Sequence, residues 1–138
     1  MDPRDVINAL ESSPYWTLLG MKVGHLEPNL ARLHLPFSAH LEQIFSVMHG
    51  GALASLLDAA GAVAFFPELD LARETISTIE LKINYLNPVT RGQAEIVATG
   101  QVIKKGKKVG VSRIEIHNTF RELVAIGIAT YAIVPREA

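Results

Sequence analysis

The sequence predicts an α+β domain in which one antiparallel sheet of about six strands packs against a single long apolar helix. The stretch from Met48 to Phe66 is rich in Ala and Leu, a composition that favours a helix. Because it is apolar on every side, we expect it to be buried on every side. Four alternating segments follow between Thr75 and Val134 with no helical segment between them. That order disfavours a parallel α/β sheet, whereas one sheet against one helix covers every apolar face.

The chain begins with a predicted short helix over residues 3–11. Asp2 suits the N-cap and Pro3 suits the first turn. The apolar side of this helix consists of Val6, Ile7 and Leu10. A second apolar cluster follows, which we interpret as core or interface rather than as a cofactor site. It consists of Tyr15, Trp16, Leu18 and Leu19.

Two strands are predicted next, over residues 21–26 and 30–36, joined by a Pro-Asn turn. In the second strand, Leu33 and Leu35 alternate with polar residues, so one face is buried and the other is wet. We expect the side chain of His34 to point to solvent. A loop then leads into the apolar helix.

The four late strands are predicted from alternation and from the turns between them. They span residues 75–86, 93–103, 109–117 and 123–134. Unbroken alternation in the first places Ile79 and Leu81 on one face and Thr78 on the other. In the third strand, the alternation of apolar residues is interrupted between Val111 and Ile114, which predicts a bulge or burial on both faces.

The last strand places small residues on one face, among them Ala125, Gly127 and Ala129. A face of this kind would let a helix approach the sheet closely. We therefore expect the apolar helix to lie against it.

Composition limits the possible functions. The 138 residues fit one domain over residues 1–138, and a net charge of -1 points neither to nucleic acid nor to a membrane as partner. The absence of cysteine excludes disulfides and cysteine-based sites. It agrees with a cytoplasmic location, as does an N-terminus without a signal-peptide pattern. The histidines show no metal-ligand spacing, so we expect no metal.

One ionisable residue, Asp58, lies inside the apolar helix. A buried carboxylate is costly unless it is paired, hydrogen-bonded or protonated. Its structural explanations are an ion pair with a core Arg or a cap on a neighbouring backbone. A membrane span needs roughly 20 apolar residues, and both Asp58 and the closing Pro67 favour a core helix instead.

The helix is preceded by His49-Gly50-Gly51. The first backbone N–H groups of a helix are unpaired and lie at the positive end of its dipole. Glycine lets a ligand approach that backbone without meeting a Cβ. Asp58 lies about two turns further along the helix. It is too far away to act on a carbonyl group bound at the helix start of the same chain, which favours a carboxylate from a partner chain. The alternative interpretation is that His49-Gly50-Gly51 only starts the helix and binds no ligand.

In this order and at this spacing, the residues resemble the PaaI-like hot-dog acyl-CoA thioesterases. The resemblance extends from about Gly20 to Val134 and rests on four short motifs. They are His49-Gly50-Gly51 with Asp58 nine residues after the histidine, INYLNP at 83–88, VIKKGK at 102–107 and LVAIGIAT at 123–130.

The resemblance implies a hot-dog fold, in which a six-stranded sheet wraps the central helix and two subunits pair their sheets. It implies that the Gly50 N–H polarises the thioester carbonyl of an acyl-CoA and that the partner subunit's Asp58 acts as base or nucleophile. Thr78 aligns with a hydroxyl residue that helps to position water. The implied assembly is a homodimer or a dimer of dimers, with no cofactor beyond the coenzyme A of the substrate.

Two positions depart from the family pattern. Gln43 stands where members commonly carry Asn, and Ser46 stands where they often carry Gly. Both departures bear on the acyl-group preference, and both residues stay in the predicted site together with Gly51. We interpret His49 as an organiser of the loop by hydrogen bonding rather than as a general base.

The lysines of a predicted hairpin turn have two interpretations. One is attraction of the coenzyme A phosphates and the other is a solvated turn. The predicted substrate-binding lysines are Lys104, Lys107 and Lys108.

Two other functions stay open beside acyl-CoA hydrolysis. The first is a non-catalytic acyl-CoA-binding module, which would share the pocket but not the turnover. The second is a hot-dog dehydratase or hydratase, with His49 and Asp58 moving protons. No Asp has a His five residues away, as the hydratase type requires.

Overall fold

The computed structural model describes residues 2–137, which form a six-stranded sheet with three α-helices and two short 3-10 helices. In chain order the elements are α1 (Pro3–Ser12), α2 (Pro14–Leu19), β1 (Lys22–Glu27), β2 (Leu30–Pro36), η1 (Ala39–Leu41), α3 (Gly50–Val63), η2 (Phe66–Glu68), β3 (Glu74–Tyr85), β4 (Glu95–Lys105), β5 (Val109–Asn118) and β6 (Leu123–Pro135). The strand order is β1-β2-β4-β5-β6-β3 and every neighbouring pair is antiparallel. The predicted fold class is confirmed.

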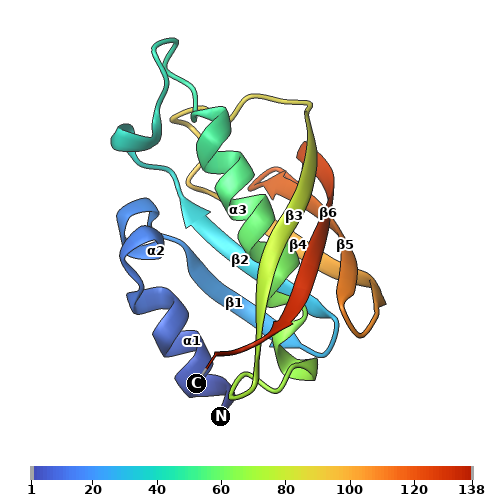
Figure 1. Ribbon diagram of the computed structural model, residues 1–138. Helices are drawn as coiled ribbons and strands as arrows, with labels where there is room; N and C mark the ends of the chain where they lie inside the picture. Colours follow the sequence, from blue (N-terminus) through green and yellow to red (C-terminus); the bar gives the residue numbers. More distant parts are fainter. Residues whose placement is uncertain (1, 138) are drawn as a thin grey trace.

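The sheet curves around α3, which lies along its concave face, while α1 and α2 lie beside β1 (Figure 1). The short N-terminal helix forms as predicted, with the Asp2 side chain accepting a hydrogen bond from the Arg4 N–H. His34 lies on the face of β2 opposite to the buried Leu33 and Leu35, as predicted. Its side chain is half-buried on that face, and its Nδ1 lies 3.1 Å from the Glu95 carboxylate on β4.

Small residues on the strands allow α3 to lie close to the sheet. A Cβ added at Gly100 on β4 would overlap the backbone carbonyl of Ala60 on α3. On β6, a Cβ at Gly127 would lie 3.0 Å from the Leu57 side chain. The predicted close approach of a helix to the small-residue face of the last strand is therefore confirmed.

Helix α3 is buried on one side only. Leu53, Leu56 and Leu57 are at most 4% exposed, but a stripe of mainly small residues is only half-buried. The stripe consists of Ala54, Ser55, Asp58, Ala59 and Ala62. The prediction of burial on every side is wrong for a single chain, because the sheet covers one side of the helix and α2 covers only part of the other.

The segment Gly50–Glu68 is also long and apolar enough to count as a candidate membrane span by length and composition. Half of it is buried inside the fold. Its contacts with the curved sheet are those of a core helix.

Strand β3 contains a bulge at Ile79. The pairing between β3 and β6 shifts between Thr78 and Glu80, and the Ile79 side chain is left 58% exposed. A bulge reverses which face later residues occupy, so Thr78 shares the helix-facing side with Leu81. The prediction of unbroken alternation is therefore wrong at this position.

Strand β5 keeps one face towards α3 along its length. Gly110, Ser112 and Ile114 are all buried, and a Cβ at Gly110 would overlap the Phe65 ring. The alternation of apolar residues is interrupted at Val111 in the sequence because the face towards α3 carries small residues there, and the Phe65 ring fills the space that they leave. Opposite Val111 the pairing irregularity lies on the neighbouring strand β4, between Val102 and Lys104. The pairing of β5 with β6 shifts separately, between Ile116 and His117.

Candidate active site

The start of α3 leaves one backbone donor unpaired. His49 is the N-cap, and its Nδ1 accepts a hydrogen bond of 2.7 Å from the Gly51 N–H. The next amides in the helix, those of Ala52 and Leu53, donate to the His49 carbonyl. Within residues 2–137 the Gly50 N–H donates no hydrogen bond. It is therefore available to a ligand at the positive end of the helix dipole.

His49 fills the role of a loop organiser in this geometry. A ring nitrogen that accepts from an N–H carries no proton, so the neutral ring bears its proton on Nε2. The imidazole satisfies one of the unpaired donors at the helix start. Its Nδ1 is thus unavailable as a base, and Asp58 has a different hydrogen-bond partner.

Tyr85, near the end of β3, fixes the position of the helix start. Its hydroxyl donates a 2.8 Å hydrogen bond to the Gly50 carbonyl. A Cβ added at Gly50 would lie 3.3 Å from the Tyr85 ring. The same glycine therefore has an anchored carbonyl and a free N–H.

Asp58 lies two turns along α3, half-buried, and faces β3. The Thr78 hydroxyl donates a 2.8 Å hydrogen bond to its Oδ1. Among the described residues it forms no salt bridge, and none of their backbone N–H groups donates to it. Both structural explanations for this carboxylate, a core Arg and a backbone cap, are therefore wrong in this chain.

The backbone of Asp58 is held from the core side. The Tyr131 hydroxyl donates a 2.8 Å hydrogen bond to the Asp58 carbonyl. Burial, and secondarily the charge of Asp58, raise the pKa of the Tyr131 phenol well above its usual range. The phenol therefore remains a neutral donor.

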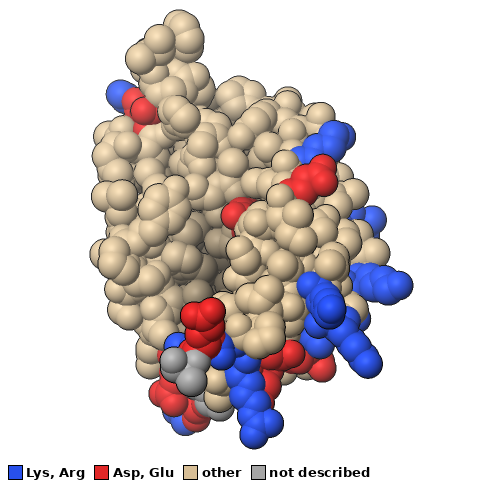
Figure 2. Space-filling model, viewed as in Figure 1, with Lys and Arg blue, Asp and Glu red and all other residues tan. Residues whose placement is uncertain are grey.

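A cleft of about 380 Å³ opens in front of the Asp58 carboxylate. It lies between the N-terminal helices and β3, in the hollow that crosses the middle of the molecule in Figure 2. Its walls consist of Tyr15, Trp16, Met21, Ser55, Asp58, Ala59, Ala62 and Thr78.

Helix α2 contributes cleft residues that the sequence did not assign to the site. The Tyr15 hydroxyl lies 2.6 Å from Ser55 Oγ, which itself donates to the Gly51 carbonyl at 2.8 Å. Tyr15 and Trp16 belong to the apolar cluster predicted to be core or interface. Only their packing across α3 reveals that they face Asp58.

Gly50 and Asp58 of one chain cannot meet the same carbonyl. Asp58 comes eight residues after Gly50, and eight residues advance about 12 Å along the helix axis. Each chain therefore presents two separate groups, a free N–H at the helix start and a carboxylate in the cleft.

The loop before α3 holds Gln43 and Ser46 away from the Asp58 cleft of the same chain. The Gln43 side-chain oxygen accepts a hydrogen bond from the Phe45 N–H. Ser46 has φ 62°, in the left-handed region that favours glycine. That backbone explains why glycine suits this position. An ion pair between Arg91 and Glu42 holds the base of the loop. Arg91 donates two hydrogen bonds to the Glu42 carboxylate, and the one from Nη2 is 2.9 Å long.

The tip of this loop carries two apolar side chains that are exposed to solvent. Ile44 is 90% exposed and Phe45 is 77% exposed. In Figure 1 the loop projects beyond the start of α3.

The predicted phosphate-binding lysines lie elsewhere. Lys104 is on β4, Lys107 and Lys108 are in the β4–β5 hairpin, and none of them lines the cleft. Most of the Lys and Arg side chains visible in Figure 2 lie along the right and lower edges, away from the central hollow, and another stands at the upper left. Within residues 2–137 no three His, Asp or Glu side chains form a group that could hold a metal ion.

Comparison with known proteins identifies relatives along most of the chain. Residues 45–125 match the family model described as the thioesterase superfamily. A medium/long-chain acyl-CoA thioesterase, YigI of Escherichia coli K12, is 31% identical over 134 residues, covering 87% of this chain and 85% of the relative.

Solved structures agree with the fold. The PaaI protein of the Escherichia coli phenylacetic acid degradation operon has a TM-score of 0.83 at 25% identity, with 95% of this chain and 91% of that chain covered. A thioesterase of Haemophilus influenzae has a TM-score of 0.86 at 22% identity, with 95% and 90% covered.

Proposed function

Because this chain belongs to the thioesterase superfamily and is a PaaI-like thioester hydrolase, we propose that it hydrolyses acyl-CoA thioesters to a free acid and coenzyme A. The observation that carries the proposal is the Asp58 carboxylate. It is held by the Thr78 hydroxyl, has no ion-pair partner among the described residues and opens onto a cleft. The named activity of the YigI relative supports acyl-CoA as substrate and medium or long acyl chains as the class.

The Gly50 N–H is the proposed oxyanion donor. Water attack converts the planar carbonyl into a tetrahedral oxyanion, and a donor aimed at that oxygen is worth roughly 3 kcal/mol in the transition state. The free N–H of Gly50 and the anchored Gly50 carbonyl support this role. The reaction uses only groups of the protein and water, with no cofactor beyond the coenzyme A of the substrate.

Asp58 is the proposed base or nucleophile. As a base it takes a proton from water while the water oxygen bonds to the carbonyl carbon; the C–S bond then breaks and coenzyme A leaves as the thiol after taking up that proton. As a nucleophile it forms an acyl anhydride and releases coenzyme A, and water then cleaves the anhydride. One turnover in ¹⁸O-water distinguishes the routes. The label enters only the product acid if Asp58 is a base, and attack on the aspartyl carbon leaves label in Asp58 if it is a nucleophile.

In this proposal the two groups are half-sites that belong to different chains. Gly50 and Asp58 lie too far apart along one helix to share a carbonyl, and the half-buried stripe of α3 is free to face a second copy. A homodimer, alone or paired into a dimer of dimers, would place the Gly50 of one chain opposite the partner subunit's Asp58. A cytoplasmic location and coenzyme A phosphate binding by Lys104, Lys107 and Lys108 remain predictions from the sequence.

The first experiment compares wild type with Asp58→Asn on short, medium, long and aromatic acyl-CoA substrates. We expect hydrolysis by wild type and a loss of about 10²–10⁴-fold in kcat for the variant, the usual contribution of a positioned base. Absence of turnover across the panel, with tight acyl-CoA binding retained, would instead support the binding-module alternative.

A second pair of variants tests the oxyanion donor. Gly50→Pro removes the N–H and keeps the helix start, because proline suits the first position of a helix; it also adds a Cβ beside the Tyr85 ring. Gly50→Ala keeps the N–H and is the matched control, since the exposed Tyr85 ring can move away from an added methyl. We expect about a 10²–10³-fold loss of kcat in the proline variant and a much smaller loss in the alanine variant. Equal losses would exclude the role.

A further inference from the structure

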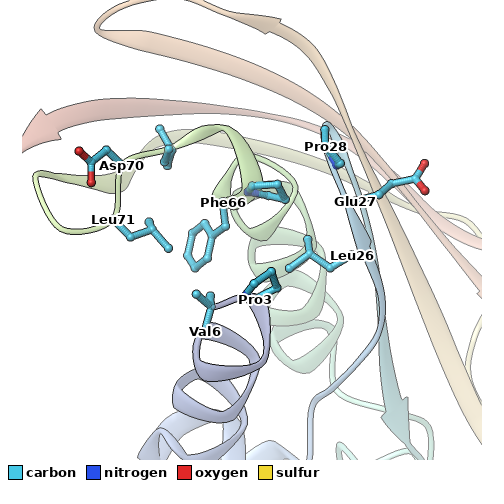
Figure 3. A pocket seen from close by; sticks show the side chains of 10 residues that line it. Pro3, Val6, Leu26, Glu27, Pro28, Phe66, Asp70 and Leu71 are labelled. Carbon is cyan, nitrogen blue, oxygen red and sulfur yellow. The ribbon is translucent and has the colours of Figure 1, made fainter. Parts of the chain in front are cut away.

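Two further spaces follow the Asp58 cleft along the same elements, towards the far end of α3, and we call the two together the groove. Beyond the cleft lies an open space of about 660 Å³ between α1 and the paired ends of β3 and β6. Beyond that lies a second space of about 380 Å³, shown in Figure 3, between the start of α1, the β1–β2 turn and η2. Val6, Phe66 and Leu71 line both.

The same elements form the walls of the cleft and of the groove. On the helical side, Asp58 and Ala62 of α3 line the cleft, and Phe66 of η2, four residues after Ala62, lines the groove. The backbone stays helical between α3 and η2, so the three residues lie on about the same side. On β3, Thr78 lines the cleft and Ile76 lines the groove. These two residues lie on the same face because residues two apart in a strand do so.

The groove is apolar where it leaves the cleft. Leu10, Ile76 and Phe66 line the groove there. Its charged lining residues lie further from Asp58, at the start of β3, after the end of β6 and in the distal space: Glu74, Arg136, Glu137, Glu27 and Asp70. In Figure 2 the central hollow is bordered by uncharged side chains along most of its length. A polar chain would lose hydration in such a channel without gaining partners, whereas an alkyl chain gains about 0.8 kcal/mol per buried methylene.

The length of the groove matches an acyl chain of medium length. Asp58 is in α3 and Phe66 begins η2. Because the backbone stays helical through the two residues that join these elements, the chain advances about 12 Å from Asp58 to Phe66. An extended alkyl chain advances about 1.25 Å per carbon, from its bond length and tetrahedral angle. About ten carbons therefore fit between the Asp58 carboxylate and Phe66. In Figure 3 the Phe66 ring lies between Leu71 and Leu26, above Val6, where the two distal spaces meet.

We propose that the groove between α1 and β3 holds the acyl chain and that Phe66 sets its length limit. This inference rests on the proposed function, since it places the thioester at Asp58. Phe66 is a specificity-determining residue in this arrangement: its ring closes the groove, and the space behind it is reserved for longer chains.

Two substitutions test the length limit in opposite directions. Ile76→Phe adds a ring inside the groove, so we expect the kcat/KM ratio of dodecanoyl-CoA to butanoyl-CoA to fall about tenfold, the effect of displacing two methylene groups. Phe66→Ala opens the space behind it, so we expect the ratio of hexadecanoyl-CoA to decanoyl-CoA to rise. General destabilisation cannot produce opposite shifts. Ile128→Phe, on the outer face of β6, is the matched control and leaves both ratios unchanged.

A binding measurement separates the groove from the reaction. Trp16 is the only tryptophan of the chain and lines the cleft, so its fluorescence reports occupancy. With Asp58→Asn protein, we expect the acyl-CoA Kd to fall about fourfold per methylene until the chain has about ten carbons, and then to level off. The Phe66→Ala change in the same background moves the plateau to longer chains.

The outcomes distinguish the two proposals. A wild type that hydrolyses no acyl-CoA, but binds with this length dependence, defeats the proposed function and supports the groove. Hydrolysis with chain-length ratios unaltered by both groove variants overturns the groove and leaves the function intact. Ile76→Phe protein that dissociates from dimers to monomers without a change in ratio would show that a second copy of the chain, rather than an acyl chain, fills the groove.

Discussion

A single hydroxyl group holds the Asp58 carboxylate in place. The Thr78 hydrogen bond of 2.8 Å goes to a charged acceptor, and bonds of that kind contribute about 1.5–3 kcal/mol. We predict that Thr78→Val, which keeps the shape of the side chain, lowers kcat roughly 10–100-fold with a smaller effect on KM. Steady-state kinetics on the preferred acyl-CoA measure this.

The serine variant separates the hydroxyl from the rest of the threonine side chain. Thr78→Ser keeps the donor and should recover most of the lost kcat. If both variants retained wild-type turnover, the hydrogen bond to Asp58 would have no part in the reaction, and Thr78 would be an ordinary strand residue.

At the scale of one element, the bulge in β3 decides whether Thr78 reaches Asp58. Alternation is a period-2 property, and one extra residue turns every side chain before it to the opposite face. Thr78 and Ile79 are both β-branched and suit either face of a strand. The sequence therefore holds no local sign of where the extra residue falls, and the pairing with β6 decides it.

The contact between α3 and β4 depends on the absence of a side chain at Gly100. We predict that Gly100→Ala lowers the free energy of unfolding by about 3 kcal/mol, the upper part of the usual range for overpacking. The added methyl would overlap the Ala60 carbonyl, which belongs to a rigid helix backbone. Urea unfolding followed by circular dichroism measures the change.

Gly92 supplies the control for that measurement. Apart from Gly92 itself and its two chain neighbours, no described residue lies within 4 Å of a Cβ placed there, so Gly92→Ala should change stability by less than about 0.5 kcal/mol. Similar losses in the two variants would show that the effect does not depend on the contact between β4 and α3.

The contribution of the loop before α3 to stability depends on pH, because the loop is held by the ion pair between Arg91 and Glu42. The hydrogen bond from Arg91 holds the pKa of Glu42 below its ordinary 4.5. A carboxyl group with a depressed folded pKa adds stability that is complete above the unfolded pKa and is lost as pH falls through the folded pKa. We predict that the wild-type Tm decreases below pH 4.5 more steeply than the Tm of Glu42→Gln. If Tm fell equally with pH in the two proteins, the ion pair between Arg91 and Glu42 would not contribute to stability.

At the scale of the whole molecule, the proposed site requires two chains. Asp58→Asn and Gly50→Pro should each be inactive alone, because each spoils one half of every site. After the two are mixed under conditions that exchange subunits, we predict about a quarter of wild-type activity, since half of the dimers are hybrids with one intact site. No recovery, with hybrid dimers demonstrated by mass spectrometry, would place both groups in one chain.

The sequence by itself determined the fold class, the six strands, the central helix and the two residues on which the proposed chemistry depends. It could do so because alternation, an Ala- and Leu-rich run and one carboxylate in an apolar helix are local properties. Gly50 and Asp58 were identified for that reason, and the distance between them along the helix already indicated two half-sites.

Only the tertiary structure decided how those residues are used. It placed Tyr15 and Trp16 opposite Asp58, turned Thr78 towards the helix through the Ile79 bulge and left one stripe of α3 half-covered. Each of these depends on the packing of segments far apart in the chain. Pairing register and the approach of one element to another are set by the sum of many contacts, so no short stretch of sequence encodes them.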